Sequence, residues 1–193
     1  MRRYLLGSLL LAALALPAGA ALEQGATAPD FTAKAALAGK QLTFSLAEAR
    51  KSGPVVVYFY PSAFTGGCNA QAHAFAESID KFTAAGAKVV GVSLDSIARL
   101  EDFSADPKYC AGKLPVASDA DGAIARSYGV DVEPAEPGAK DSRGVEIGHG
   151  FAQRLTFVVT SDGKVAATIG GVSPTENVQK TLAAVEQLAK KGG

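Results

Sequence analysis

The residues best suited to chemistry lie in one short stretch, Pro61-Ser62-Ala63-Phe64-Thr65-Gly66-Gly67-Cys68. A strongly apolar run, residues 55–60, precedes it, and an amphipathic segment that begins at Asn69 follows it. We therefore predict that a buried strand ends at Pro61 and that a short loop delivers Cys68 to the first turn of a helix. Free backbone N–H groups and the positive end of the helix dipole favour an anion there, so they favour the reactive thiolate over the thiol. Thr65 places a hydroxyl three residues before this sulfur.

The segments around this stretch alternate between strand and helix patterns. Apolar runs and alternation predict strands over residues 42–46, 87–94, 151–159 and 165–169. Helical spacing of apolar residues predicts helices over 46–51, 69–85, 96–105 and 177–190. Residues 161–164 predict a hairpin turn, whereas residues 131–150 lack periodicity and predict a long loop. This order predicts one α/β sandwich domain over residues 21–193.

The first twenty residues have the features of a secretory signal peptide. A basic start with Arg2 and Arg3 is followed by an apolar run over residues 4–16 and a small-residue cleavage pattern that ends at Ala20. A retained membrane anchor is the alternative, but the apolar run is short for a span. We therefore expect an exported protein, periplasmic or secreted, with no membrane association after cleavage.

Charge and composition exclude several classes of partner. Cleavage removes Arg2 and Arg3, so the 19 basic side chains become 17 against 19 acidic ones, a net charge of −2. No basic stripe is present, so we do not expect nucleic-acid binding. His73 and His149 are far apart and have no clustered ligands, so we expect no metal site. We interpret His73 as a surface residue of its helix.

The pattern formed by Pro61, Thr65 and Cys68, Pro-x-x-x-Thr-x-x-Cys, resembles the active-site motif of the peroxiredoxins. Cys68-x-x-Gln71-Ala72 is similar to the helix start in the peroxiredoxin Q (bacterioferritin-comigratory) group. The resemblance extends over about residues 28–188, including Ala-Pro-Asp-Phe at 28–31 and the run over 89–130. It implies a thioredoxin-like fold, with a central mixed sheet flanked by helices.

The resemblance also implies an activity and assigns roles to residues. The chain is expected to be a thiol-dependent peroxidase that reduces hydrogen peroxide and organic hydroperoxides through a sulfenic acid on Cys68. Thr65 and nearby backbone N–H groups orient thiolate and peroxide, and Pro61 shields the pocket from water. Arg154 matches the arginine of the family's hairpin, and its guanidinium stabilises negative charge on sulfur and on the peroxide oxygen. No metal, flavin or haem is implied.

Cys110, 42 residues after Cys68, is interpreted as the resolving cysteine. Many members of the peroxiredoxin Q group carry that cysteine where this chain has His73, so their short-range disulfide is impossible here. In some single-chain peroxiredoxins it lies in the helix at whose end Cys110 falls. A disulfide requires Cα atoms within about 7 Å, so the hypothesis includes local unwinding around Gly66-Gly67-Cys68. An external thioredoxin-like dithiol protein completes the cycle.

Three alternatives to this interpretation remain. The first is one-cysteine chemistry with an external resolving thiol. The second, a thiol–disulfide oxidoreductase, needs Cys-x-x-Cys, whereas this chain has Gly-Gly-Cys-Asn. The third is a non-catalytic thioredoxin-fold binding protein with a structural disulfide. The segment over residues 131–150 is longer than is usual in peroxiredoxins, and we interpret it as an insertion that forms a rim or a partner contact. A homodimer is possible.

Overall fold

The structure is a computed structural model that describes residues 20–191. The predicted signal peptide therefore lies outside the described residues, apart from Ala20. Within the described part of the chain, no helix is both long enough and apolar enough to cross a bilayer.

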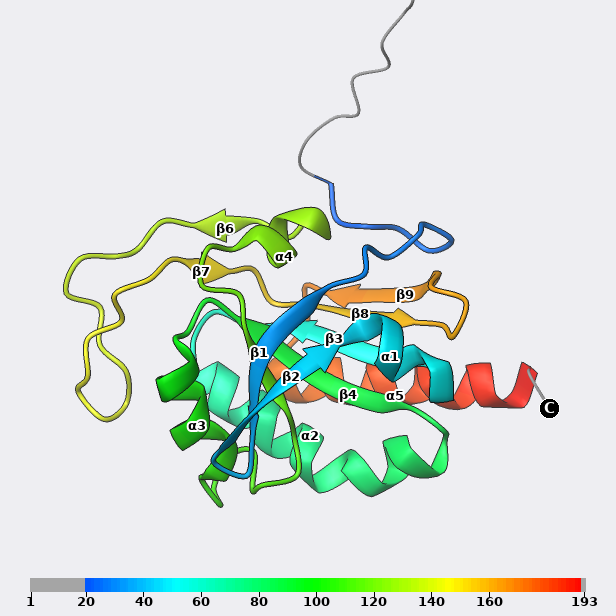
Figure 1. Cartoon of the computed structure of the whole chain (residues 1–193), viewed down its shortest axis with the longest axis horizontal. Coiled ribbons are helices and arrows are strands. Elements are labelled where there is room, and N and C mark those ends of the chain that lie inside the picture. Colours follow the sequence, from blue (N-terminus) through cyan, green and yellow to red (C-terminus); the bar gives the residue numbers. More distant parts are fainter. Residues whose placement is uncertain (1–19, 192–193) are drawn as a thin grey trace, which may run out of the picture.

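A seven-stranded mixed sheet runs through the middle of the molecule (Figure 1). Its strand order is β2-β1-β5-β4-β3-β8-β9, with β3, β4 and β5 parallel and the other neighbours antiparallel. A separate pair, β6 and β7, lies apart from it. The strands are β1 Thr32–Leu37, β2 Lys40–Ser45, β3 Val55–Phe59, β4 Lys88–Ser93, β5 Val116–Ser118, β6 Val132–Glu133, β7 Phe151–Ala152, β8 Leu155–Val159 and β9 Val165–Gly170.

Helices cover both faces of this sheet. The long helices α2 (Gly66–Ala84) and α5 (Pro174–Lys191) pack with α3 (Ile97–Ala105) on one face of the sheet. The shorter α1 (Leu46–Ala49), its extension η1 (Arg50–Ser52) and α4 (Ala123–Ser127) cover the other. This arrangement confirms the predicted sandwich with a central mixed sheet.

The central strand β3 explains why the core has two halves. All five of its side chains are buried, and successive side chains point to opposite faces. Val55, Val57 and Phe59 belong to the cluster under α1 and α4, whereas Val56 and Tyr58 belong to the cluster under α2, α3 and α5. A fully apolar run is what a strand buried on both faces requires.

Most predicted boundaries are confirmed, and local signals explain them. The Ser45 hydroxyl accepts from the N–H of Glu48 at the start of α1, as predicted. Helix α2 ends in a Schellman motif, because the N–H groups of Gly86 and Ala87 donate to the carbonyls of Thr83 and Phe82. Gly86 has φ +78°, which glycine adopts without strain.

Two features of the sheet differ from the prediction. Strands β1 and β5 were not predicted. The Ala-rich sequence of β1 has little strand propensity, yet β1 is held by pairing with β2 and β5, and the three-residue β5 is held by pairing with β1 and β4. The single strand predicted over residues 151–159 is wrong. It is two strands in different sheets, since the N–H of Gln153 bonds to the Asp131 carbonyl and Arg154 belongs to neither strand.

Candidate active site

Cys68 lies at the start of α2, which the loop over residues 60–65 connects to the carboxyl end of β3. Thr65 is the N-cap and Cys68 the third helical residue, so the predicted first-turn position is confirmed. The sulfur-bearing residue is only 2% exposed. The Thr65 hydroxyl does not cap the helix but donates to the carbonyl of Ser62 at 2.8 Å. The N–H groups of the first turn therefore remain available to an anion.

Arg154 lies beside Cys68, as the resemblance implies. Its Nη2 donates to the Cys68 Sγ at 3.4 Å, and its Nη1 donates to the Oε1 of Gln71. The gap between β7 and β8 frees Arg154 from the sheet ladder and lets its guanidinium reach the start of α2. Gly67 provides the space, since a Cβ at that position would lie 3.1 Å from Nη2. A buried sulfur thus faces a fixed positive charge and free N–H groups, an arrangement that stabilises a thiolate.

The loop between β3 and α2 is strained at Phe64, which has φ +62°. Its ring stacks under the Arg143 guanidinium, 3.3 Å from the ring centroid, and packs edge-on against Phe103 and Tyr109. The N–H of Ser142 donates to its carbonyl at 2.9 Å. The loop over residues 131–150 therefore covers the active-site loop, and the segment that precedes Cys110 contacts the same ring.

Asp95 holds the active-site loop from beneath. It is fully buried just after β4 and accepts hydrogen bonds from the Ala63 N–H at 2.7 Å and the Ser62 hydroxyl at 3.0 Å. His149 Nε2 lies 2.8 Å from its Oδ1, and the other ring nitrogen faces the Gly150 carbonyl at 2.7 Å. Two facing acceptors favour the imidazolium form of His149.

Opposing effects set the pKa values of this pair. Burial alone raises the pKa of Asp95, but hydrogen bonds from His149, Ala63 and Ser93, together with the charge of His149, hold the pKa below its usual value. Burial lowers the pKa of His149, but the hydrogen bond and charge of Asp95 outweigh burial and raise it. The two shifts agree, so the structure favours a carboxylate–imidazolium pair.

Arg99 and Asp141 connect this pair to the 131–150 loop. The Arg99 guanidinium lies 2.8 Å from carboxylate oxygens of both Asp95 and Asp141, and it donates to the Ala63 carbonyl at 2.9 Å. Burial raises the pKa of Asp141, but hydrogen bonds from the N–H groups of Val145 and Arg143 and from the Arg143 side chain lower it overall. We call Asp95, Arg99, Asp141 and His149 the loop anchor.

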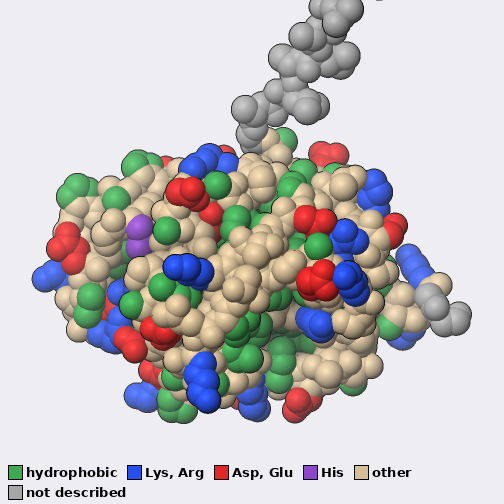
Figure 2. Space-filling model, in the orientation of Figure 1, with side chains coloured by type: hydrophobic (Ala, Val, Ile, Leu, Met, Phe, Trp, Pro, Cys, Tyr) green, Lys and Arg blue, Asp and Glu red, His purple; other side chains and the backbone are tan. Residues whose placement is uncertain are grey.

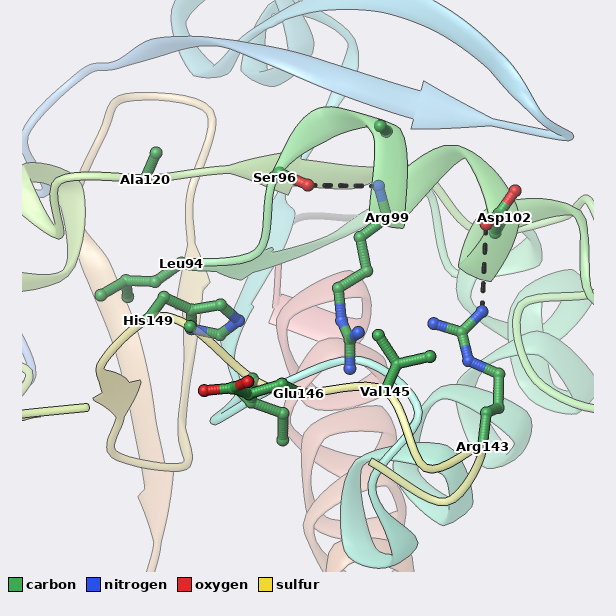
Figure 3. A pocket seen from close by; sticks show the side chains of 12 residues that line it. Leu94, Ser96, Arg99, Asp102, Ala120, Arg143, Val145, Glu146 and His149 are labelled. Atoms are coloured by element: carbon green, nitrogen blue, oxygen red, sulfur yellow. Dashed lines mark hydrogen bonds and ion pairs between the residues drawn. The ribbon is translucent and has the colours of Figure 1, made fainter. Parts of the chain in front are cut away.

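Beside the loop anchor is a pocket of about 640 Å³ (Figure 3). Arg99 extends into it from α3 toward Val145 and Glu146 of the 131–150 loop, and Arg143 approaches Asp102 at 3.9 Å. Cys68 does not line this pocket, whereas Arg99 and His149 of the loop anchor do, so the pocket is separate from the site around the Cys68 sulfur.

Cys110 lies in the turns after α3, and both cysteines are free thiols. Its side chain is completely buried, and burial, followed by the charge of Asp106, raises the pKa of its thiol. A neutral buried thiol is a poor nucleophile, so Cys110 can attack only after the surrounding segment opens.

The sequence patterns missed the loop anchor. Its members are separated by up to 54 residues, and periodicity reports only near neighbours. The one local signal was Asp95, a carboxylate directly after a buried strand.

His73 is exposed, and its side chain lies 3.4 Å from that of Glu77, as expected for a surface residue. Residues 20–191 contain no cluster of side chains suited to a metal ion. On the face shown in Figure 2, acidic and basic side chains are interspersed.

Residues 24–168 match the AhpC/TSA family. Peroxiredoxin Q, chloroplastic, from Sedum lineare is 34% identical over 174 residues, which cover 88% of this chain and 81% of the relative. Peroxiredoxin Bcp from Xanthomonas campestris is 32% identical over 137 residues, 71% of this chain and 79% of the relative. The crystal structure of peroxidoxin BcpB from Mycobacterium tuberculosis superimposes with a TM-score of 0.71 at 27% identity, covering 86% of this chain and 98% of that one.

Proposed function

This chain belongs to the AhpC/TSA family, and from that membership we propose that Cys68 is its peroxidatic cysteine and Cys110 its resolving cysteine. The enzyme is a thiol-dependent peroxidase of the peroxiredoxin type, similar to the peroxiredoxin Q and Bcp proteins. The observation that carries the assignment is the contact of 3.4 Å between Arg154 Nη2 and Cys68 Sγ in the first turn of a helix.

In the first step, the Cys68 thiolate attacks the terminal oxygen of a hydroperoxide, ROOH. The O–O bond breaks, a proton is taken up, and the products are Cys68 sulfenic acid and ROH. The Arg154 guanidinium lies where it stabilises negative charge on the sulfur and on the departing oxygen. The Thr65 hydroxyl donates its hydrogen bond to the Ser62 carbonyl, so its oxygen remains free to accept a hydrogen bond from the peroxide O–H. Pro61, half-buried at the end of β3, shields this side from water.

In the second step, the Cys110 sulfur attacks the sulfenic sulfur of Cys68, forms the S–S bond and releases water. Both cysteines are buried as free thiols in this structure, so we expect the segments around them to move before the two sulfurs pair. The contact between Phe64 and Tyr109 joins the two segments that must move. A dithiol protein of the thioredoxin type then reduces the disulfide by thiol–disulfide exchange and is itself oxidised.

One observation favours a second candidate. The complete burial of Cys110 and the raised pKa of its thiol suit a one-cysteine enzyme in which an external thiol attacks the Cys68 sulfenic acid. The peroxidatic step is the same in both candidates, so only the fate of the sulfenic acid separates them.

Intact-mass measurement after one equivalent of hydrogen peroxide tests both candidates. A rapid loss of about 2 Da, abolished in Cys68→Ser and in Cys110→Ser, supports the intramolecular disulfide. A gain of about 16 Da on Cys68 with Cys110 untouched supports the one-cysteine enzyme. No mass change in the wild type would refute the role of Cys68 in either.

We propose further that the protein is exported and acts in the periplasm or outside the cell. The support is the basic, apolar and small-residue pattern of residues 1–20. Expression of the full chain in a Gram-negative host should give a periplasmic protein whose mass corresponds to a start at Ala21. Recovery of the uncleaved chain in the cytoplasm would contradict the proposal.

A further inference from the structure

A buried chain of polar side chains runs from Arg154 to the C-terminal helix. Arg154 Nη1 donates to Gln71 Oε1, and Gln71 Nε2 donates to Asn177 Oδ1 at 3.0 Å. The Thr156 hydroxyl donates to the same Asn177 oxygen at 2.7 Å, and Asn177 Nδ2 donates to the Ile169 carbonyl at 3.1 Å. Gln71, Thr156 and Asn177 are all completely buried. The chain therefore joins α2, β8, β9 and α5 behind the active-site arginine.

The two ends of this chain fix the orientation of both amides. The Ile169 carbonyl can only accept, so the amide nitrogen of Asn177 must face it and the amide oxygen must face Gln71. Gln71 must then give its nitrogen to Asn177 and its oxygen to Arg154, which can only donate. A flip of either amide would leave buried polar atoms facing groups of the same kind, and such unpaired groups are costly.

This chain of side chains also leaves the positive charge of Arg154 without a neutralising anionic partner among the described residues. The partner at position 71 is a neutral amide, and none of the ion pairs formed among residues 20–191 includes Arg154. A carboxylate there would hold the guanidinium equally well but would offset its charge beside the Cys68 sulfur. Gln71 therefore positions the cation without neutralising it.

We propose that Asn177 is a positioning residue for the Cys68 thiolate, acting through Gln71 and Arg154. Its amide, oriented by Ile169 and Thr156, presents Gln71 in the one orientation that holds Arg154 on the sulfur. The inference rests on the proposed role of Cys68, and it assigns the C-terminal helix α5 a part in setting the reactivity of a sulfur on α2.

Two buried threonines of this protein offer a matched pair of variants for the test. The hydroxyls of Thr156 and Thr181 are both buried, and each donates a 2.7 Å hydrogen bond to Asn177. Thr156 bonds to the side-chain oxygen, whereas Thr181 bonds to the backbone oxygen. Thr156→Val and Thr181→Val therefore remove similar hydrogen bonds, but only the first is part of the chain that ends on Arg154.

The readout is the pH profile of iodoacetamide alkylation of Cys68, measured in the Cys110→Ser background. Thr156→Val should lower the alkylation rate at neutral pH about twofold or more and move the profile to higher pH. Thr181→Val should lower the melting temperature to a similar degree and leave the profile unchanged. Asn177→Leu should have the larger effect, about five- to tenfold, because it frees the Gln71 amide.

The proposal is overturned if Thr156→Val gives the profile of Thr181→Val, whatever the folding of Asn177→Leu. That outcome leaves the peroxidase assignment intact, because wild-type protein would still react with peroxide, with a loss of about 2 Da or a gain of about 16 Da. If the wild type does not react with peroxide, the proposed function fails independently of these profiles.

Discussion

Replacement of Gly67 by alanine should weaken the contact between Arg154 and the sulfur of Cys68. A Cβ at Gly67 would lie 3.1 Å from Arg154 Nη2 and 3.4 Å from the side chain of Pro174. Gly66, the preceding residue in the same turn, has nothing within 4 Å of its Cβ position. Both glycines are helical and have ordinary backbone angles. Gly66→Ala is therefore the matched control.

The expected magnitude follows from the geometry. A relaxed carbon contact lies near 3.5–4.0 Å, so the guanidinium must retreat by about 0.5 Å. The Nη2–Sγ separation then grows from 3.4 Å to about 3.9 Å. With an effective dielectric constant of about 20, the attraction between unit charges falls from about 4.9 to about 4.3 kcal/mol. The difference of about 0.6 kcal/mol corresponds to about a threefold weaker preference of the site for thiolate over thiol.

Both alanine variants gain helix propensity, up to about 1 kcal/mol in a helix interior and less in a first turn. Neither is therefore expected to unfold. Alkylation of Cys68, in the Cys110→Ser background, should be slower in Gly67→Ala, by up to about threefold in the pH range where the thiol form predominates, and unchanged in Gly66→Ala. Stopped-flow reaction with hydrogen peroxide should follow the same order. Wild-type rates in both variants would refute the contact as the cause. An equal loss of rate in both would refute it as well and would point to stiffening of the turn.

Three further predictions concern the active-site loop and its anchor. Arg143→Ala removes the cation stacked on Phe64, so peroxide-driven disulfide formation, followed by intact mass, should accelerate about two- to fivefold; a slower reaction would contradict the role of this contact as a restraint. The raised pKa of His149 contributes stability that is present below its unfolded pKa of about 6.5 and is lost as pH rises through the folded pKa, whereas the lowered pKa of Asp95 contributes stability that is lost only in acid. The melting-temperature advantage of the wild type over His149→Gln should therefore shrink from mildly acidic to alkaline pH, and a difference that does not change with pH would disprove the pairing. Thr65→Val should lower kcat/KM for peroxide about tenfold with Cys68 alkylation near wild type, while Thr65→Ser retains activity; equal activity in both would remove Thr65 from the peroxide site.

The local parts of the site could be predicted because they depend on neighbours in the chain. An apolar run ending at Pro61, followed by glycines and a helical pattern, is enough to place Cys68 in the first turn of α2. Hairpin and cap signals placed β8, β9 and the start of α1 for the same reason. The position of Arg154 beside the sulfur came from the family resemblance, because 86 residues separate the two side chains.

The remaining parts depended on tertiary structure. Strand β1 carries weak local preference and forms because β2 and β5 supply its hydrogen bonds. The break that frees Arg154 arises from the pairing of β7 with β6, which no period within residues 151–159 reveals.

Contacts between distant segments decided how the reactive sulfur is held. Gln71 meets Asn177 across 106 residues, and Asp95 meets His149 across 54. Gln71, Asn177 and Asp95 are buried and His149 is half-buried, so each pair contains a buried polar group that needs its partner, since a lone buried polar group is costly. Thus the sequence alone determined the cysteine, its helix and the fold class. Only the packing of α5 and of the 131–150 loop decided which side chains hold that cysteine and the loop before it in place.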